Sequence, residues 1–297
     1  NALAYLRLLC VILKNTVILH LTMLHRSAKS ALLLVLPLLL LLSACQDDDN
    51  GPEPPTAVER PLPDDIATIF DNRNCTNCHR DDNATYGLSL SSVSAIRQGY
   101  RFGSVVVPNS VLYSHILWHT NPDSIYDGPS FPPYMPYTAN YEFDESNMLS
   151  ETEYEAIKSW INSGAPDREG KPMWYDKQSQ ASGKGFFLCS GSDLMGVVDG
   201  ETGVVMRYIT VGNDPTRIEN PHYVQHSPDG QYIYVSLIEG GAIEKYSTTT
   251  YERVGRTSQN LGAQVAHVEV SSDGRWLVVS NWVSSDEAVD LYSIDAN

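Results

Sequence analysis

The spacing of apolar residues changes twice along this sequence and divides the chain into three stretches. Residues 31–42 form a nearly unbroken apolar run. Between about residues 60 and 170, apolar residues recur three and four positions apart, as in Ile66, Ile69 and Phe70, which predicts amphipathic helices. From residue 183 onward, short alternating runs are separated by Gly-rich turns, which predicts β-strands. We therefore expect a leader, a small helical domain and an all-β domain.

The helical stretch contains one helix whose beginning and end can both be predicted. Ser150 and Glu153 form a capping box, and it opens a helix with Tyr154, Ile157 and Ile161 on one face. Gly164 and Pro166 are typical of residues that end such a helix. A middle helix is expected within residues 110–119, where His115 and His119 would share a face.

The β stretch repeats itself. Three strand-like segments end at Ser190, Ser236 and Ser280, which are 46 and 44 residues apart. Asp-Gly turns precede the last two segments, and residues 198–204 indicate a hairpin. A period of about 40–45 residues with four strands per unit is typical of a β-propeller. Residues 183–297 would hold about 2.5 blades, so we expect an incomplete propeller from a longer gene product.

Composition excludes several classes of protein. The chain of 297 residues is 42% hydrophobic, which is enough for packed cores and excludes global disorder. It has 20 Lys and Arg against 36 Asp and Glu, a net charge of -16, which argues against a nucleic-acid binder. Five cysteines are too few for a disulfide scaffold. The sequence has neither a Gly-rich phosphate loop nor a nucleophile elbow, so no catalytic set supports a free-standing enzyme.

The apolar run resembles part of an export signal. Arg26 and Lys29 precede it, and it is shorter than the ~20 residues that span a bilayer. Leu-Ser-Ala-Cys at residues 42–45 resembles the lipobox of bacterial lipoproteins, which implies a lipidated N-terminal Cys45. Met23 is the natural initiator, so residues 1–22 are expected to be upstream sequence. The alternatives are an uncleaved anchor helix with a free Cys45 thiol and a double-hairpin anchor.

An acidic, Pro-rich tether is expected after Cys45. Its Asp47–Asp49 run resembles the surface-export tags of some outer-membrane lipoproteins, although a plain spacer explains it equally well. The localisation that follows is the envelope of a Gram-negative bacterium, lipid-anchored in the outer membrane. The expected divisions are upstream residues and signal peptide 1–45, tether 46–62, helical domain 63–170, linker 171–182 and partial propeller 183–297.

The helical stretch contains Cys75-Thr76-Asn77-Cys78-His79, the C-x-x-C-H pattern of c-type haem attachment. Two thiols can add to the two vinyl groups of one porphyrin, and His79 can then offer its imidazole to the iron. A zinc ribbon needs two further soft ligands, and only Cys189 remains in the mature chain. A redox dithiol needs a βαβ context, which is absent. We therefore predict one covalent haem c at Cys75 and Cys78, with His79 as an axial iron ligand.

Met135 is the predicted second axial ligand. It lies in Pro132-Pro133-Tyr134-Met135-Pro136, where proline on both sides stiffens the backbone and could hold a thioether at the iron. The rival ligands are Met148, Met173, His115 and His119. The two histidines are better explained as a packed or surface pair.

Residues 60–168 resemble the planctomycete-type cytochrome c domains. The family implies an all-α fold, a single covalent haem, electron transfer and methionine as the sixth iron ligand. Arg80 stands where a glycine often follows the histidine. The shared residues are Cys75-x-x-Cys78-His79, Gly87–Leu90, Val107–Ser110, Leu112-Tyr113, Met135-Pro136, Leu149–Glu151, Trp160-Ile161 and Gly164–Asp167. Residues 183–297 resemble the YVTN-type propellers of exported bacterial proteins.

These features predict a membrane-anchored electron carrier with a propeller that serves as a docking platform. Its redox partner is expected to present a basic surface, because the chain is acidic. One alternative is an oxidoreductase with a metal or d-type haem in the propeller, and His267 could provide a ligand there. Another alternative is a haem-based sensor. His222, His226 and His267 do not align as a repeated ligand, so we expect them to be structural. Cys189 is expected to be a buried free thiol.

Overall fold

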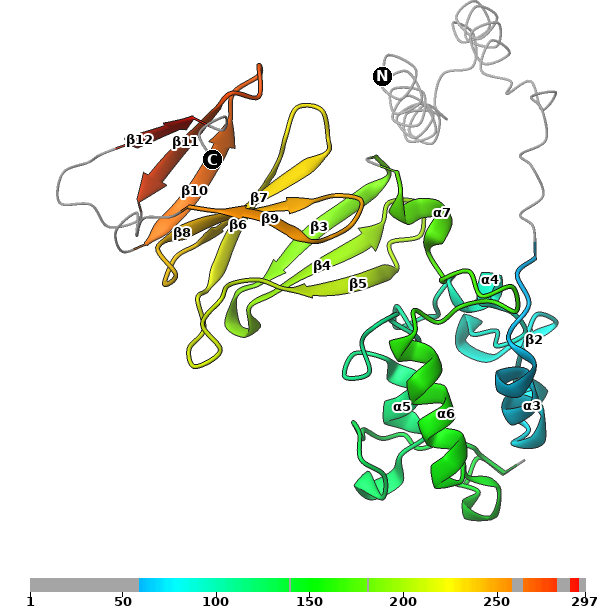
Figure 1. The fold of residues 1–297 in the computed structure, drawn as a ribbon. Helices are drawn as coiled ribbons and strands as arrows, with labels where there is room; N and C mark the ends of the chain where they lie inside the picture. Colours follow the sequence, from blue (N-terminus) through cyan, green and yellow to red (C-terminus); the bar gives the residue numbers. More distant parts are fainter. Residues whose placement is uncertain (1–58, 139, 181, 258–263, 282–288, 294–297) are drawn as a thin grey trace, which may run out of the picture. The chain divides into compact units, whose positions relative to one another are not determined.

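The computed structural model describes residues 59–138, 140–180, 182–257, 264–281 and 289–293. The expected signal peptide, Cys45 and most of the tether lie outside the described residues. From Glu59 onward the chain forms one compact unit. Its first part is helical and its second part is built from β-sheets (Figure 1).

The helical part is organised around two amphipathic helices, α3 (Asp64–Asn72) and α6 (Glu151–Asn162). Helix α3 buries the predicted apolar stripe of Ile66, Ile69 and Phe70. Helix α6 begins at the predicted capping box, in which Ser150 and Glu153 bond to each other's backbone N–H. The remaining elements are short: η1 (Cys75–Asn77), β1 (His79–Arg80), β2 (Asn83–Ala84), η2 (Thr85–Gly87), α4 (Val93–Ile96), α5 (His115–His119), η3 (Pro122–Ser124), η4 (Glu145–Asn147) and α7 (Tyr175–Gln178).

The middle helix is shorter than the sequence predicts. Helix α5 begins at His115. Backbone groups before it form hydrogen bonds with the Ser114 side chain and not with the backbone of a helix. The Ser114 hydroxyl accepts from Val107 N at 3.0 Å and donates to Ser110 O at 2.7 Å. A serine that bonds locally in this way competes with helix formation.

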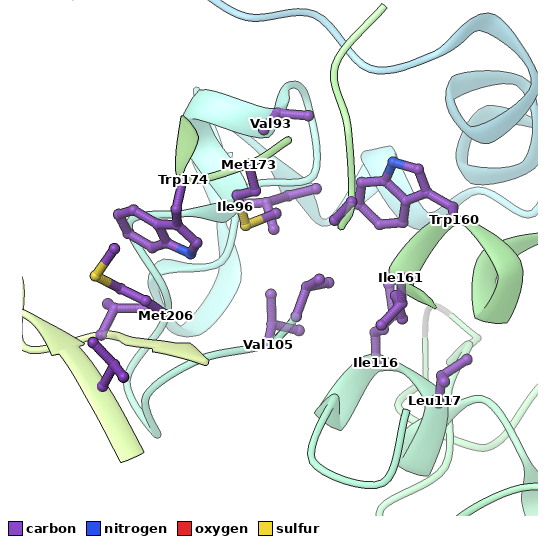
Figure 2. Packing of buried hydrophobic residues seen from close by; sticks show 14 of the residues in the cluster. Val93, Ile96, Val105, Ile116, Leu117, Trp160, Ile161, Met173, Trp174 and Met206 are labelled. Carbon is purple, nitrogen blue, oxygen red and sulfur yellow. The ribbon is translucent and has the colours of Figure 1, made fainter. Parts of the chain in front are cut away.

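One hydrophobic core connects the helices (Figure 2). Ile157 and Ile161 of α6 are buried with Ile96 of α4 and Leu117 of α5. Met173 is also fully buried in this core. Figure 2 places Met206, from the first sheet, beside Trp174, so the core continues into the β part.

Both ends of the helical part are packed beyond the boundaries expected from the sequence. Arg60 and Leu62, assigned to the tether, are buried. Pro61 also forms a β-bridge with Ser92. Met173 and Trp174, assigned to the linker, are buried as well. The packed helical part therefore runs from about residue 59 to the end of α7.

The β part consists of three antiparallel sheets in chain order. Figure 1 shows them as separate groups of strands. The first contains β3 (Lys184–Cys189), β4 (Leu194–Asp199) and β5 (Val205–Thr210). The second contains β6 (Pro221–His226), β7 (Tyr232–Leu237), β8 (Ala242–Ser247) and β9 (Arg253–Arg256). The third contains β10 (Val265–Val270), β11 (Trp276–Asn281) and β12 (Val289–Ser293).

These sheets follow the repeat found in the sequence. Ser236 lies on β7 and Ser280 on β11, while Ser190 directly follows β3. The three strands are thus equivalent members of successive blades, and the hairpin predicted over residues 198–204 joins β4 to β5. Each sheet is a simple meander in which sequential strands are neighbours, as in a propeller blade. The described strands amount to one four-stranded blade between two three-stranded sheets.

Ser104 links the helical part to the first sheet. Its hydroxyl accepts from the Val205 N–H at 2.7 Å and donates to the Val205 carbonyl at 3.1 Å. Val204 and Met206 on either side are buried. Nearby, the rings of Tyr113 and Tyr208 lie 4.5 Å apart. Strand β5 is therefore held by both polar and aromatic contacts.

None of the helices in the described residues is both long enough and apolar enough to cross a bilayer. The apolar run at residues 31–42 lies outside the described residues.

Candidate functional site

The C-x-x-C-H motif forms a tight loop directly after α3. Asn74 has a left-handed backbone (φ 58°) that ends the helix and leads into the 3₁₀ turn η1. Asparagine tolerates this conformation better than most residues. The turn closes through a bond from Cys78 N to Cys75 O, and Leu90 N then donates to His79 O at 2.8 Å. The backbone around the two cysteines and the histidine is therefore fixed by hydrogen bonds.

The two thiols of the loop have different surroundings. Cys75 is half-buried against the hydrophobic core, whereas Cys78 is exposed. Burial raises the pKa of the Cys75 thiol to about 11, so the thiol stays protonated at neutral pH. Catalytic dithiols and thiolate metal ligands depend on a lowered pKa. The surroundings of Cys75 thus disfavour the redox-dithiol alternative.

His79 is half-buried at the start of β1, and burial lowers its pKa. Its Nδ1 atom is buried and has no hydrogen-bond partner among the described residues. A buried imidazole nitrogen without a partner is unusual, because such groups are nearly always satisfied. Backbone groups of Thr85 and Leu88 lie close enough to the imidazole to counteract part of this lowering of its pKa.

Met135 lies in the loop between α5 and α6 and is tied to α5. Its N–H donates to the His119 carbonyl at 2.7 Å. The His119 ring bonds to the same loop, with Nδ1 at 3.1 Å from Phe131 O and 2.9 Å from Pro133 O. No hydrogen bond among the described residues joins Met135 directly to the Cys75–His79 loop.

The other side chains considered in the sequence as axial ligands are placed differently. Met173 is completely buried in the hydrophobic core, which leaves its sulfur no room to bind an external group. Met148 is half-buried just before the Ser150 cap. His115 is bonded through Nδ1 to the Tyr100 hydroxyl at 2.9 Å. Of the methionines considered as ligands, Met135 is the one held in a loop by a neighbouring histidine.

An aromatic row runs from Tyr86, which follows the C-x-x-C-H loop in the chain, to Phe131 in the Met135 loop. Successive ring centroids in this row are 4.6 to 6.1 Å apart. Three members are unusually exposed for large apolar rings: Tyr86 (57%), Phe102 (63%) and Phe131 (59%). Exposed apolar patches of this kind mark binding surfaces. The row consists of Tyr86, Phe102, Tyr100, His115, Trp118 and Phe131.

The aromatic row was not predicted from the sequence. Its members come from two loops and two short helices, η2 and α5, and no single periodic pattern relates them. One local signal was present in Gly99-Tyr100-Arg101-Phe102-Gly103, where two aromatic residues lie between glycines. Tyr100 and Gly103 close this segment with paired backbone bonds of 2.8 Å, so both rings are presented by a tight turn.

The three propeller histidines have separate protein contacts. His222 Nδ1 lies 3.0 Å from Ala266 O, and His267 Nε2 lies 2.9 Å from a Glu269 carboxylate oxygen. The His226 ring packs against Phe186, with centroids 5.3 Å apart. In the part of the chain that the structure describes, no three Cys, His, Asp or Glu side chains form a metal-binding group.

Cys189 at the end of β3 is a free thiol, as predicted, but it is half-buried and not fully enclosed. The expectation of a buried thiol was wrong in this respect. The reason is that each residue of β3 is only partly covered, although the neighbours Phe187 and Leu188 are apolar.

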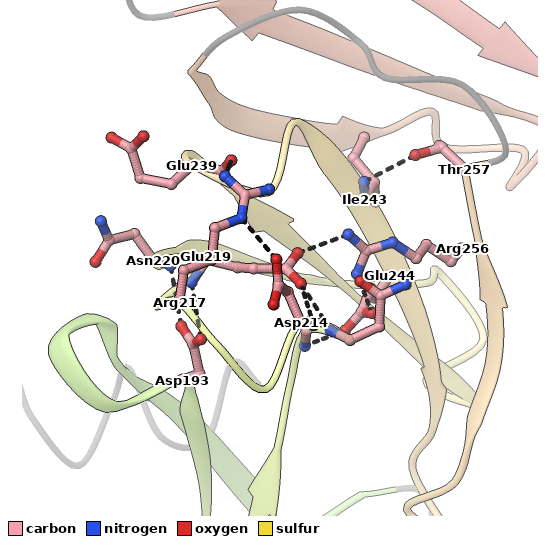
Figure 3. Close-up of polar contacts among 12 residues, drawn as sticks. Asp193, Asp214, Arg217, Glu219, Asn220, Glu239, Ile243, Glu244, Arg256 and Thr257 are labelled. Atoms are coloured by element: carbon pink, nitrogen blue, oxygen red, sulfur yellow. Dashed lines mark hydrogen bonds and ion pairs between the residues drawn. The ribbon is translucent and has the colours of Figure 1, made fainter.

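A cluster of paired charged side chains lies in the propeller region (Figure 3). Glu219 and Glu244 are almost completely buried, and Arg256 bridges them with two ion pairs of 2.6 Å. Burial favours the neutral form of Glu219, but Arg256 and the N–H groups of Asn213 and Asp214 outweigh it and lower its pKa. Charges paired this fully leave no reactive group, and removal of one partner would leave a buried charge uncompensated.

An open hollow of ≈ 570 Å³ lies over the loop between β5 and β6. It is lined by Asp193, Asp214, Arg217 and neighbouring residues. Asp193 accepts from the N–H groups of Glu219 and Asn220, and Asp214 is paired with Arg217 at 3.0 Å. Figure 3 shows these side chains directed toward the loop backbone and one another.

Comparison with known proteins supports a propeller in the second half of the chain. Residues 199–297 match the family described as Lactonase, 7-bladed beta-propeller. The match covers about a third of the chain. It shows that these residues form a β-propeller region, in agreement with the three meandering sheets. No curated protein matches the chain.

Solved structures also resemble a part of the chain. A putative 6-phosphogluconolactonase from Bacteroides fragilis is 16% identical, with a TM-score of 0.34 over 39% of this chain and 33% of that one. Hydrazine synthase of Kuenenia stuttgartiensis is 28% identical, with a TM-score of 0.32 over 38% and 31%. A second putative 6-phosphogluconolactonase, from Bacteroides uniformis, is 17% identical, with a TM-score of 0.31 over 37% and 33%. The chain therefore spans about a third of each of these structures.

Proposed function

We propose that the helical part carries one covalent haem c and that the protein transfers single electrons. Cys75 and Cys78 would hold the porphyrin through thioether bonds, and His79 and Met135 would be the axial iron ligands. When bound, this group supplies a one-electron ferric/ferrous couple. The protein would contribute Cys75 and Cys78 as attachment points and His79 and Met135 as axial side chains. The apolar side chains of the aromatic row would surround the porphyrin.

The observation that carries this proposal is the state of the Cys75–His79 loop. Its backbone is fixed, one thiol is exposed, and the buried Nδ1 of His79 has no partner among the described residues. The aromatic row is a second feature that suits a haem. It begins seven residues after His79 and ends four residues before Met135, and its exposed rings match the apolar face of a porphyrin.

We also propose where the protein is located and what it binds. We propose that Cys45 is lipidated and anchors the chain in the outer membrane, and that the propeller is a docking platform. The net charge of -16 favours a redox partner with a basic surface, because opposite charge speeds the encounter of two proteins.

The structure gives less support to a second haem or metal in the propeller. Such a group would need ligand side chains that converge, whereas His222, His226 and His267 each contact a different neighbour. An optical spectrum separates the two functions, because a d-type haem absorbs in the red and a lone c-type haem does not.

The decisive experiment is expression of the full chain together with a cytochrome c maturation system. We expect the band on a denaturing gel to stain for haem peroxidase activity, and the pyridine haemochrome spectrum to give one haem per chain. The Cys75→Ala, Cys78→Ala double variant should lose the stain. Cys189→Ala is the matched control, since it removes the other described thiol and should keep the stain. A wild-type band without stain would contradict the proposal.

A further inference from the structure

His119 contacts the Met135 loop on two sides. Its backbone carbonyl accepts the Met135 N–H at 2.7 Å. Its ring reaches back to the start of the same loop, where Nδ1 lies 3.1 Å from Phe131 O and 2.9 Å from Pro133 O. The loop is therefore attached to His119, the last residue of α5, at Phe131, Pro133 and Met135.

The ring contacts fix the tautomer of His119. Carbonyl oxygens only accept hydrogen bonds, so Nδ1 must carry the hydrogen and donate to both. The other nitrogen, Nε2, is then unprotonated in the neutral ring. Two roles are compatible with this geometry: His119 can hold the loop through Nδ1, or it can itself bind iron through Nε2, since metal-bound histidines often donate their second N–H to a carbonyl.

We propose that His119 is a positioning residue that holds the Met135 thioether in place for the iron; this rests on the proposed haem function. All three contacts of His119 converge on one segment of this loop. The ring fixes residues 131 and 133, and the backbone fixes residue 135 itself. A segment as short as residues 131–135, anchored at three points, has few remaining conformations, so the direction of the Met135 side chain is set before the iron ligand forms.

Two substitutions of His119 separate positioning from ligation. In His119→Asn, the amide NH₂ occupies nearly the place of Nδ1–H and can donate to the same carbonyls, but nothing replaces Nε2. His119→Ala removes both. Positioning predicts that the Asn variant keeps the weak long-wavelength absorption of ferric Met–haem ligation and a near wild-type midpoint potential. The Ala variant should lose that absorption and have a lower potential, as expected when methionine leaves the iron.

The loop contact can also be measured without haem. In a Cys75→Ala, Cys78→Ala background, amide hydrogen exchange should be faster across residues 131–135 in His119→Ala than in His119→Asn. His267→Ala serves as a histidine control in the propeller and should alter neither the spectrum nor this exchange. Thermal unfolding of each variant identifies any that fail to fold, in which case the Asn variant still tests the proposal.

Each other outcome overturns a stated part of the argument. A wild-type spectrum without the Met–haem absorption, changed in both the Asn and Ala variants but not in Met135→Ala, would make His119 the ligand and reject positioning. Unchanged spectra and exchange in both variants would reject the His119 proposal but leave the haem function intact. Absence of haem from the wild-type chain would reject the proposed function and the His119 role together.

Discussion

The Arg60 guanidinium lies 2.7 Å from the Asp167 carboxylate, measured from Nε to Oδ2, and joins the two ends of the helical part. The two residues are only 8% and 2% exposed. Arg60 also donates from its Nη atoms to the carbonyls of Lys171, Pro172 and Met173 at 2.6 to 2.8 Å. One side chain therefore satisfies a carboxylate and three carbonyl groups 107 or more residues away.

We predict that Arg60→Met strongly destabilises the protein. It leaves the Asp167 charge buried without its cationic partner, and loss of one member of a buried pair costs about 3–5 kcal/mol. Urea unfolding measures the change. The matched control is Arg168→Met, because Arg168 pairs with Asp64 at the surface, where an ion pair contributes about 0–1 kcal/mol. Equal effects of the two substitutions would show that burial of the Arg60 pair does not matter.

The same pair should make the protein sensitive to acid. Burial alone would raise the pKa of Asp167, but bonds from Arg60 and from backbone N–H groups outweigh it and lower the pKa. The stabilisation is therefore present above the unfolded-state pKa of about 3.9 and is lost as pH falls through the lower folded-state value. In Asp167→Asn, the free energy of unfolding should be lower at pH 7 and should fall less steeply between about pH 5 and pH 2. Urea titrations at several pH values test this, and parallel curves for the two proteins would contradict it.

In the propeller region, Arg256→Met should be among the most damaging substitutions. It leaves Glu219 and Glu244 buried next to each other without the arginine that bridges them. We expect a loss of about 3–5 kcal/mol, seen as a lower midpoint of thermal or urea unfolding. Arg275→Met is the control, since Arg275 and its partner Asp273 are largely exposed. A loss near that of the control would mean that Arg253, the other partner of Glu244, compensates.

Gly128 should not tolerate a methyl group. A Cβ at this position would lie 2.1 Å from the Tyr154 hydroxyl, and Tyr154 is fully buried on α6. Because the ring cannot move without disturbing the core, Gly128→Ala should cost about 1–3 kcal/mol. Gly191→Ala is the control, since a Cβ there would have nothing within 4 Å. Circular dichroism melts of both variants measure the difference, and equal melting temperatures would show that the loop can shift.

Local signals made α3, α6 and the blades predictable from the sequence. The stripe of Ile66, Ile69 and Phe70, the Ser150 capping box and each single strand depend on residues close together in the chain, and the blades were visible because the strand pattern recurs. The Arg60–Asp167 pair could not be predicted in this way, because its members are far apart and Arg60 seemed to belong to a polar tether. Helix α5 was overestimated because Ser114 uses its hydroxyl to bond to nearby backbone groups.

The candidate site likewise has a part that could be predicted from the sequence and a part that could not. The C-x-x-C-H motif and Met135 were visible as short patterns, and they remain the predicted haem ligands and attachment points. The aromatic row and the contacts of His119 depend on how loops from residues 86 to 135 fold back on α5. Such contacts follow from packing of the whole helical part, and no spacing in the sequence encodes them.

The contact between Ser104 and Val205 has a consequence for self-association. The outer strand of a blade presents free N–H and C=O groups, which can recruit a strand from another molecule. At Val205 the Ser104 hydroxyl occupies both groups, as a neighbouring strand would. The helical part thus closes one end of β5 to intermolecular strand addition without extending the sheet.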